Sequence, residues 1–128
     1  ARHRTRLGLN NLKLMYNIVP EAAKYLADRD VVEIAKTTVF NNRPDALCVS
    51  GITAGSSTDQ QVLERVKNAI PTVAVFANTG CRVSNIEKVL SVADGAVVGT
   101  TFKKDGLFDN FVDTDRVKAF MEAARRAR

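Results

Sequence analysis

Four short apolar runs divide this chain, and each is bounded by turn-forming residues such as Gly, Pro, Asn or Asp. Runs of this kind are typical of β-strands. The second run, "DALCVSG", is almost continuously apolar, which is typical of a strand buried on both faces. We therefore predict strands at Leu12–Val19, Asp45–Gly51, Thr72–Asn78 and Gly95–Thr100.

Between these runs, apolar residues recur every three or four positions, which is the period of an amphipathic helix. Asp30, Ser84 and Asp113 stand where helix N-caps are expected, and a Glu follows the first two after three residues. Pro20 suits the first position of one or two helical turns. The predicted helical segments are about 20–27, 30–42, 59–70, 83–93 and 113–127.

The order of elements is strand, helix, strand, helix, repeated through the chain. This alternation predicts an α/β domain with parallel strands and right-handed crossovers. Four βα units fill about 120 residues, whereas a complete (β/α)8 barrel needs about 250. The pattern therefore favours one half-barrel domain over residues 1–128, the C-terminal half of a TIM barrel. A small open flavodoxin-like sheet is the alternative, although it usually has a fifth strand.

The segments "PDALCVSGIT" and "ADGAVVGTTF" resemble each other and lie two βα units apart. In each, an Asp precedes the strand and Gly and Thr follow it. Asp45 and Asp94 thus fall at strand starts, at the opposite end from the ligand face of α/β barrels. We interpret both aspartates as structural.

The net charge of +5 comes from the ends of the chain. Six arginines lie in the basic tails, about 1–8 and 123–128, and the remainder carries 13 basic and 14 acidic residues. Basic tails are more often solvated ends than binding surfaces. With no Trp and no aromatic platform, nucleic acid is not an expected partner.

Cysteine and histidine usage limits the chemistry. Cys48 lies in an apolar run and Cys81 in a loop, and two cysteines do not form a disulfide framework, which favours a reducing, cytoplasmic compartment. The sole histidine, His3, lies in a tail, which argues against a Ser-His-Asp triad, a Cys-His dyad or a histidine zinc site. No metal or cofactor is evident, no catalytic constellation is complete, and no apolar run is long enough to span a membrane.

Ligands of parallel α/β proteins gather at the carboxyl ends of the strands. Small and hydroxylated residues follow the predicted strands there, and glycine allows close approach of a ligand to the backbone. The last two strands would form the usual phosphate corner of a barrel, with support from a helix N-terminus. The alternative is that these residues only form turns. The candidate ligand-binding residues are Asn17, Ser50, Gly51, Thr53, Gly55, Asn78, Gly80, Ser84, Gly99, Thr100 and Lys103.

Candidates for catalysis are few. Asp59 stands at a helix start and is better interpreted as a cap. Cys81 has no histidine to activate it, and Glu21, after the first strand, is an acid–base candidate without further support. Whether the protein is an enzyme stays open on these residues.

Long segments of the chain resemble the BtpA family: "PEAAKYLADRD", "TTVFNNRPDALCVSGITAG", "FANTGCRVSNIEKVLSVADGAVVGTTFKKDG" and "VDTDRVKAFMEAAR". The resemblance covers the chain from about Asn11 onward. It implies a TIM barrel of about twice this length, whose first four strands this chain does not contain. It also implies a link to photosystem I biogenesis at the thylakoid surface, the role of the founding cyanobacterial member, and no assigned catalytic mechanism.

Three functions are consistent with these observations. The leading hypothesis is a barrel protein that binds a small phosphorylated or otherwise anionic metabolite at the carboxyl ends of the strands. The alternatives are a non-enzymatic biogenesis or stability factor for membrane complexes, peripheral to the membrane, and an enzyme of sugar or nucleoside metabolism. Four strands with open edges also predict that the chain associates, with a second copy or with the other half of a barrel.

Overall fold

A computed structural model describes residues 2–20, 23, 25–51 and 57–127. Four parallel strands form one sheet in the order β1-β2-β3-β4, so each strand pairs with its neighbours in sequence. The strands are β1 (Met15–Val19), β2 (Ala46–Ser50), β3 (Ala74–Asn78) and β4 (Gly95–Val97). The helices are α1 (Arg2–Arg6), α2 (Val31–Asn42), α3 (Gln60–Ala69), α4 (Ile86–Leu90) and α5 (Thr114–Arg126), with 3-10 turns η1 (Thr100–Phe102) and η2 (Lys104–Gly106).

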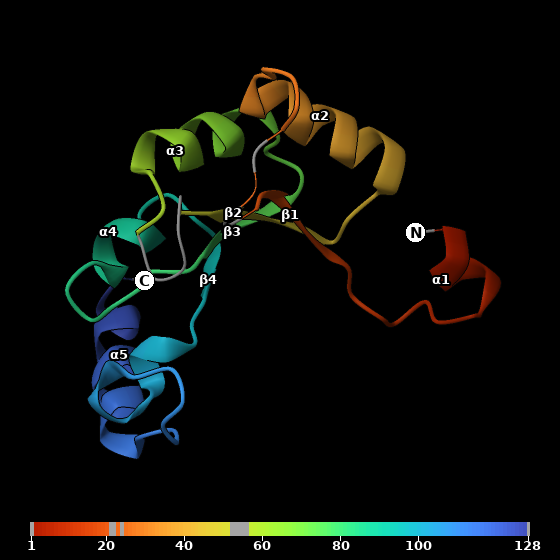
Figure 1. Cartoon of the computed structure of the whole chain (residues 1–128). Coiled ribbons are helices and arrows are strands. Elements are labelled where there is room, and N and C mark those ends of the chain that lie inside the picture. The colour runs from red at the N-terminus through yellow and green to blue at the C-terminus, as the bar shows by residue number, and fades with distance from the viewer. Residues whose placement is uncertain (1, 21–22, 24, 52–56, 128) are drawn as a thin grey trace.

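The helices α2, α3, α4 and α5 lie on one face of the sheet and leave the other bare, whereas α1 lies to one side (Figure 1). Alternate strand residues such as Leu47, Val49, Val75 and Ala77 are completely buried and join side chains of the helices in a single apolar cluster. The opposite face is less protected, since Met15 is 45% exposed and Val97 is 42% exposed. The arrangement is half of a TIM barrel, in which the bare face corresponds to the barrel interior.

Aspartates join neighbouring strands at the amino end of the sheet, by the same device in two places. The Asp45 N–H donates to Leu14 O (2.9 Å), and the Leu14 N–H donates to Asp45 Oδ2 (2.9 Å). The Asp94 N–H donates to Val75 O (2.8 Å), and the Val75 N–H donates to Asp94 Oδ2 (2.7 Å). We call each reciprocal pair an aspartate clasp. Both aspartates therefore have structural partners, as the sequence predicts.

Each clasp also holds cations. Arg4 Nη1 lies 2.8 Å and Lys13 Nζ 3.2 Å from Asp45 carboxylate oxygens, and Lys67 Nζ lies 2.6 Å from Asp94 Oδ2. The interpretation of the N-terminal tail as merely solvated is thus wrong for Arg4. Its side chain is only 19% exposed because it spans α1 and the start of the sheet.

Helix caps agree with the sequence in three places and disagree in one. Asp30, Asp59 and Asp113 each accept backbone N–H bonds at the start of α2, α3 and α5. Ser84 does not cap α4, because the helix begins only at Ile86, after Asn85. Asn85 Oδ1 instead accepts the Arg82 N–H (2.7 Å), and this closes a turn before the helix.

The strands are shorter than predicted, and the segment after β4 differs most. The fourth strand ends at Val97 because the chain turns into η1 and η2, and Lys103 then pairs with Val112 in an isolated antiparallel bridge. The described residues after Pro20 form no helix before α2, whereas one or two turns were predicted. Glu21 lies outside the described residues, as do Thr53 and Gly55.

Candidate functional site

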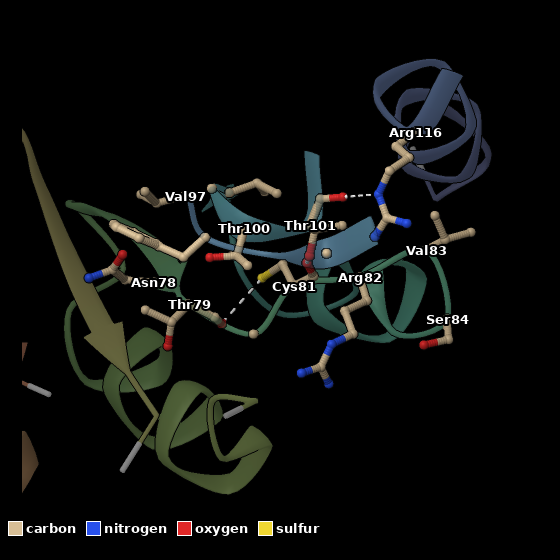
Figure 2. A pocket seen from close by; sticks show the side chains of 15 residues that line it. Asn78, Thr79, Cys81, Arg82, Val83, Ser84, Val97, Thr100, Thr101 and Arg116 are labelled. Carbon is tan, nitrogen blue, oxygen red and sulfur yellow. Dashed lines mark hydrogen bonds between the residues drawn. The ribbon is translucent and has the colours of Figure 1, made fainter. Parts of the chain in front are cut away.

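A pocket of about 580 Å³ lies where the carboxyl ends of β3 and β4 meet the segments that follow them (Figure 2). Volumes of this size are usual for sites of small ligands. Five of the residues predicted from the sequence line it: Asn78, Gly80, Ser84, Gly99 and Thr100. The structure therefore brings together four residues of the predicted phosphate corner, Gly80, Ser84, Gly99 and Thr100.

Two arginines supply the positive charge of this pocket. Arg82 and Arg116 both line it, and the described residues of the lining include no carboxylate. Arg116 Nε donates to Thr101 O (2.8 Å), which holds this side chain beside the pocket (Figure 2). Lys103, one of the candidate ligand-binding residues predicted from the sequence, is not among the lining residues.

The loop between β3 and α4 has a defined conformation. Thr79 and Gly80 both have positive φ (84° and 66°). Glycine adopts positive φ readily, which explains the glycine at position 80. Asn85 Nδ2 donates to Gly80 O (2.9 Å), and Thr101 Oγ1 donates to Cys81 O (2.6 Å). These bonds tie the loop to both α4 and η1, so the pocket walls are fixed from two sides.

One predicted ground for the site needs correction, and the structure gives a second reason, besides the missing histidine, why Cys81 is not activated. The helix N-terminus contributes little, because α4 has only five residues and its first turn makes no side-chain cap. Cys81 lines the pocket but is 3% exposed, and burial raises the pKa of its thiol. The Sγ–H faces Thr79 O at 3.7 Å, so the neutral thiol is a wall of the pocket rather than an activated nucleophile.

Three further predicted residues lie on β1 and β2 or directly after β2. Asn17, in the middle of β1, donates to Ser50, the last residue of β2 (2.7 Å), and Gly51 is buried directly after β2. In the described part of the chain, no group of three or more His, Cys, Asp or Glu side chains is arranged to hold a metal ion. No described helix is both long and apolar enough to cross a membrane.

Arg82 and Arg116 were missed by reasoning from the sequence. Arg116 carried a usable signal: it stands in the first turn of α5, three residues after the cap Asp113. The positive end of the helix dipole disfavours a cation there, so a basic residue in this position suggests a role other than helix stability.

Comparison with known proteins places this chain in a family. The model of the BtpA family matches residues 1–126. The chain belongs to the BtpA family. It is 58% identical over 127 residues to the putative sgc region protein SgcQ of Escherichia coli, covering 99% of this chain and 47% of the relative. It is 26% identical to the photosystem I biogenesis protein BtpA of Synechocystis, covering 95% of this chain and 42% of the relative.

Solved structures confirm the half-barrel fold of this BtpA-family chain. N-(5'-phosphoribosyl)anthranilate isomerase from Pyrococcus furiosus superposes with a TM-score of 0.63 at 16% identity, covering 95% of this chain and 55% of that structure. The native KDPGal structure gives a TM-score of 0.62 at 22% identity, covering 97% and 53%. The chain spans about half the length of the curated relatives and of the solved structures that it matches.

Proposed function

We propose that this BtpA-family chain binds a small phosphorylated or otherwise anionic metabolite at the carboxyl ends of β3 and β4. The observation that carries the proposal is the pocket itself, which combines Gly80, Gly99 and Thr100 with two arginines, Arg82 and Arg116. Glycine lets an anion approach backbone N–H groups closely, and a guanidinium binds phosphate and carboxylate in a bidentate manner.

The charge of the bound group is testable at Gly99. An added Cβ at Gly99 meets no atom within 4 Å, so a substitution can begin there without displacing a neighbour. A carboxylate at about 5 Å from a bound anion costs about 3 kcal/mol at the effective dielectric constant of a protein surface. We expect Gly99→Asp to weaken binding of inorganic phosphate about a hundredfold in isothermal titration calorimetry.

Gly99→Asn is the matched control, because it adds the same number of heavy atoms without the charge. It should retain most of the affinity for phosphate. Equal affinity of the Asp and Asn variants for phosphate would contradict an anion site at this corner. So would a failure of the unaltered protein and both variants to bind phosphate.

The bare face of the sheet leads to a second proposal, on association. The edges of β1 and β4 have no partner strand among the described residues, and open edges recruit further strands. We propose that four further strands, from a second copy or from the other half of a barrel, cover Met15 and Val97. Light scattering after size exclusion tests this for the isolated chain. A protease-resistant monomer of 14.0 kDa would refute it.

A different function is favoured by the surface beside the pocket. Four large apolar residues between η2 and α5 are strongly exposed: Leu107 (59%), Phe108 (76%), Phe111 (92%) and Val112 (62%). Exposed apolar groups of this kind mark interaction sites, and one relative is named as a photosystem I biogenesis protein. In this alternative, the chain acts as an assembly or stability factor by surface contact.

A single variant distinguishes the anion-binding function from the assembly function. Phe111→Ser should abolish co-purification with membrane complexes if the assembly function is correct, while affinity for phosphate stays unchanged. If co-purification persists in Phe111→Ser, the exposed loop is not the contact. A third possibility, an enzyme of sugar or nucleoside metabolism, shares the anion site and differs by turnover of the bound metabolite.

A further inference from the structure

Three polar side chains form a hydrogen-bonded array across three neighbouring strands, and two of them are the last residues of β2 and β3. Asn17 Nδ2 donates to Ser50 Oγ (2.7 Å), and Asn78 Nδ2 donates to the same oxygen (3.0 Å). The three residues belong to β1, β2 and β3. Ser50 is 4% exposed, whereas Asn17 at one end of the array is exposed.

The orientation of the array leaves hydrogen-bonding capacity for a ligand. Asn17 Oδ1 accepts the Val19 N–H (3.2 Å), which fixes its amide so that Nδ2 faces Ser50. The Ser50 hydroxyl accepts both amide bonds, so its own proton remains for a third partner. Neutral donors and acceptors of this kind match hydroxyl and carbonyl groups and carry no charge of their own.

The array continues into the anion pocket. Asn78 is a member of the array and also lines the pocket beside Gly80 and Gly99. Strands in a sheet lie about 4.8 Å apart, so β1 and β3 are separated by about 10 Å. A ligand held at the corner of β3 and β4 must therefore extend over two strands to reach Asn17.

We propose that the ligand is a sugar phosphate of five or six carbons. Its phosphate occupies the corner of β3 and β4, and its hydroxyl or carbonyl groups contact Asn78, Ser50 and Asn17. This inference rests on the proposed anion site and adds the chemistry of the rest of the ligand. A three-carbon phosphate would reach Asn78 but not Asn17.

The test compares four probes by calorimetry with the protein at its full natural length: inorganic phosphate, glycerol 3-phosphate, ribose 5-phosphate and fructose 6-phosphate. At least one of the two sugar phosphates should bind ten times more tightly than inorganic phosphate. Asn17→Ala should remove this preference and leave affinity for inorganic phosphate within twofold. Asn68→Ala, an exposed asparagine on α3, is the matched control and should change neither.

The outcomes separate the two proposals. If inorganic phosphate binds but no sugar phosphate binds more tightly, the array is structural and the inference fails while the anion site stands. Equal weakening of all probes by Asn17→Ala also overturns it. If no probe binds, the anion site and the inference fail together. Should Asn17→Ala unfold, Ser50→Ala removes the shared hydroxyl and gives the same readout.

Discussion

The two ends of this sheet use polar residues in opposite ways. At the amino end, Asp45 and Asp94 are occupied by backbone N–H groups and by Arg4, Lys13 and Lys67. At the carboxyl end, glycine, threonine and asparagine surround a pocket with two arginines. Charges that are satisfied within the fold stabilise it, whereas a cavity lined by glycine and small polar residues leaves room for a ligand.

The two ends differ most in the space around two glycines, Gly95 at the amino end of β4 and Gly99 beyond its carboxyl end. A Cβ on Gly95 would lie 2.5 Å from Phe76 Cε1, whereas a Cβ on Gly99 meets nothing within 4 Å. Gly95→Ala should lower the free energy of unfolding by about 2 kcal/mol, because the added Cβ would overlap the ring of Phe76, which must then shift. Chemical denaturation measures this. Gly99→Ala is the control and should stay within about 0.5 kcal/mol; equal costs at both positions would erase the distinction.

Removal of a clasp carboxylate should have the next largest effect. Asp94→Ala leaves the Val75 N–H and Lys67 without their acceptor, so we expect a loss of about 1.5 kcal/mol of unfolding free energy. Affinity for phosphate should not change. Ser84→Ala, at the exposed carboxyl end, should show the reverse: the affinity for phosphate falls and the free energy of unfolding does not change. A selective loss of ligand binding in Asp94→Ala, at constant melting temperature, would show that the amino end is not purely structural.

The acid dependence of the other clasp is the smallest expected effect. The Leu14 N–H, with Lys13 and Arg4, lowers the pKa of Asp45 from 3.8 to about 2. A carboxylate with a lowered pKa stabilises the fold above its unfolded pKa, and this contribution disappears as the pH falls through the folded value. The difference in melting temperature between the unaltered protein and Asp45→Asn should therefore be constant above about pH 5. It should shrink as the pH falls from 4 to 2. A difference that persists at pH 2 would assign the stabilisation to another contact.

The clasp at Asp94 is formed against an opposing cost. Burial disfavours ionisation of this carboxyl group, but the hydrogen bonds from Lys67 and from the Val75 N–H outweigh it, and the pKa of Asp94 lies below its ordinary value. The charge of Asp94 is thus maintained by the fold, as expected for a structural group.

The sequence predicted what depends on local pattern. The alternation of apolar runs and amphipathic segments led to the four parallel strands and the half barrel, and Asp30, Asp59 and Asp113 cap helices because capping needs only nearby backbone. The Ser84 cap was wrong because Asn85 competes for the same turn through its bonds to Arg82 and Gly80. The spacing of apolar residues along the chain does not distinguish Ser84 from Asn85 as the residue before the helix.

The parts that were missed depend on contacts between distant segments. Arg116 approaches the pocket only because Thr101 holds it from a different element. The position of Arg4 depends on Asp45, which lies 41 residues further along the chain. The 3-10 turns after β4 were not predicted, since a segment rich in Gly and Thr also suits a longer strand. Beyond η1, Lys103 pairs with Val112, which lies further along the chain.

The repeated clasp has a consequence for how such a chain is assembled from smaller parts. One clasp joins β1 to β2 and the other joins β3 to β4, and the similar segments "PDALCVSGIT" and "ADGAVVGTTF" carry the two aspartates. The half barrel therefore contains the same clasp in each of its two βαβ units, β1-α2-β2 and β3-α4-β4. Duplication in evolution, or transfer between barrels by protein engineering, would preserve this device only when strands move in pairs.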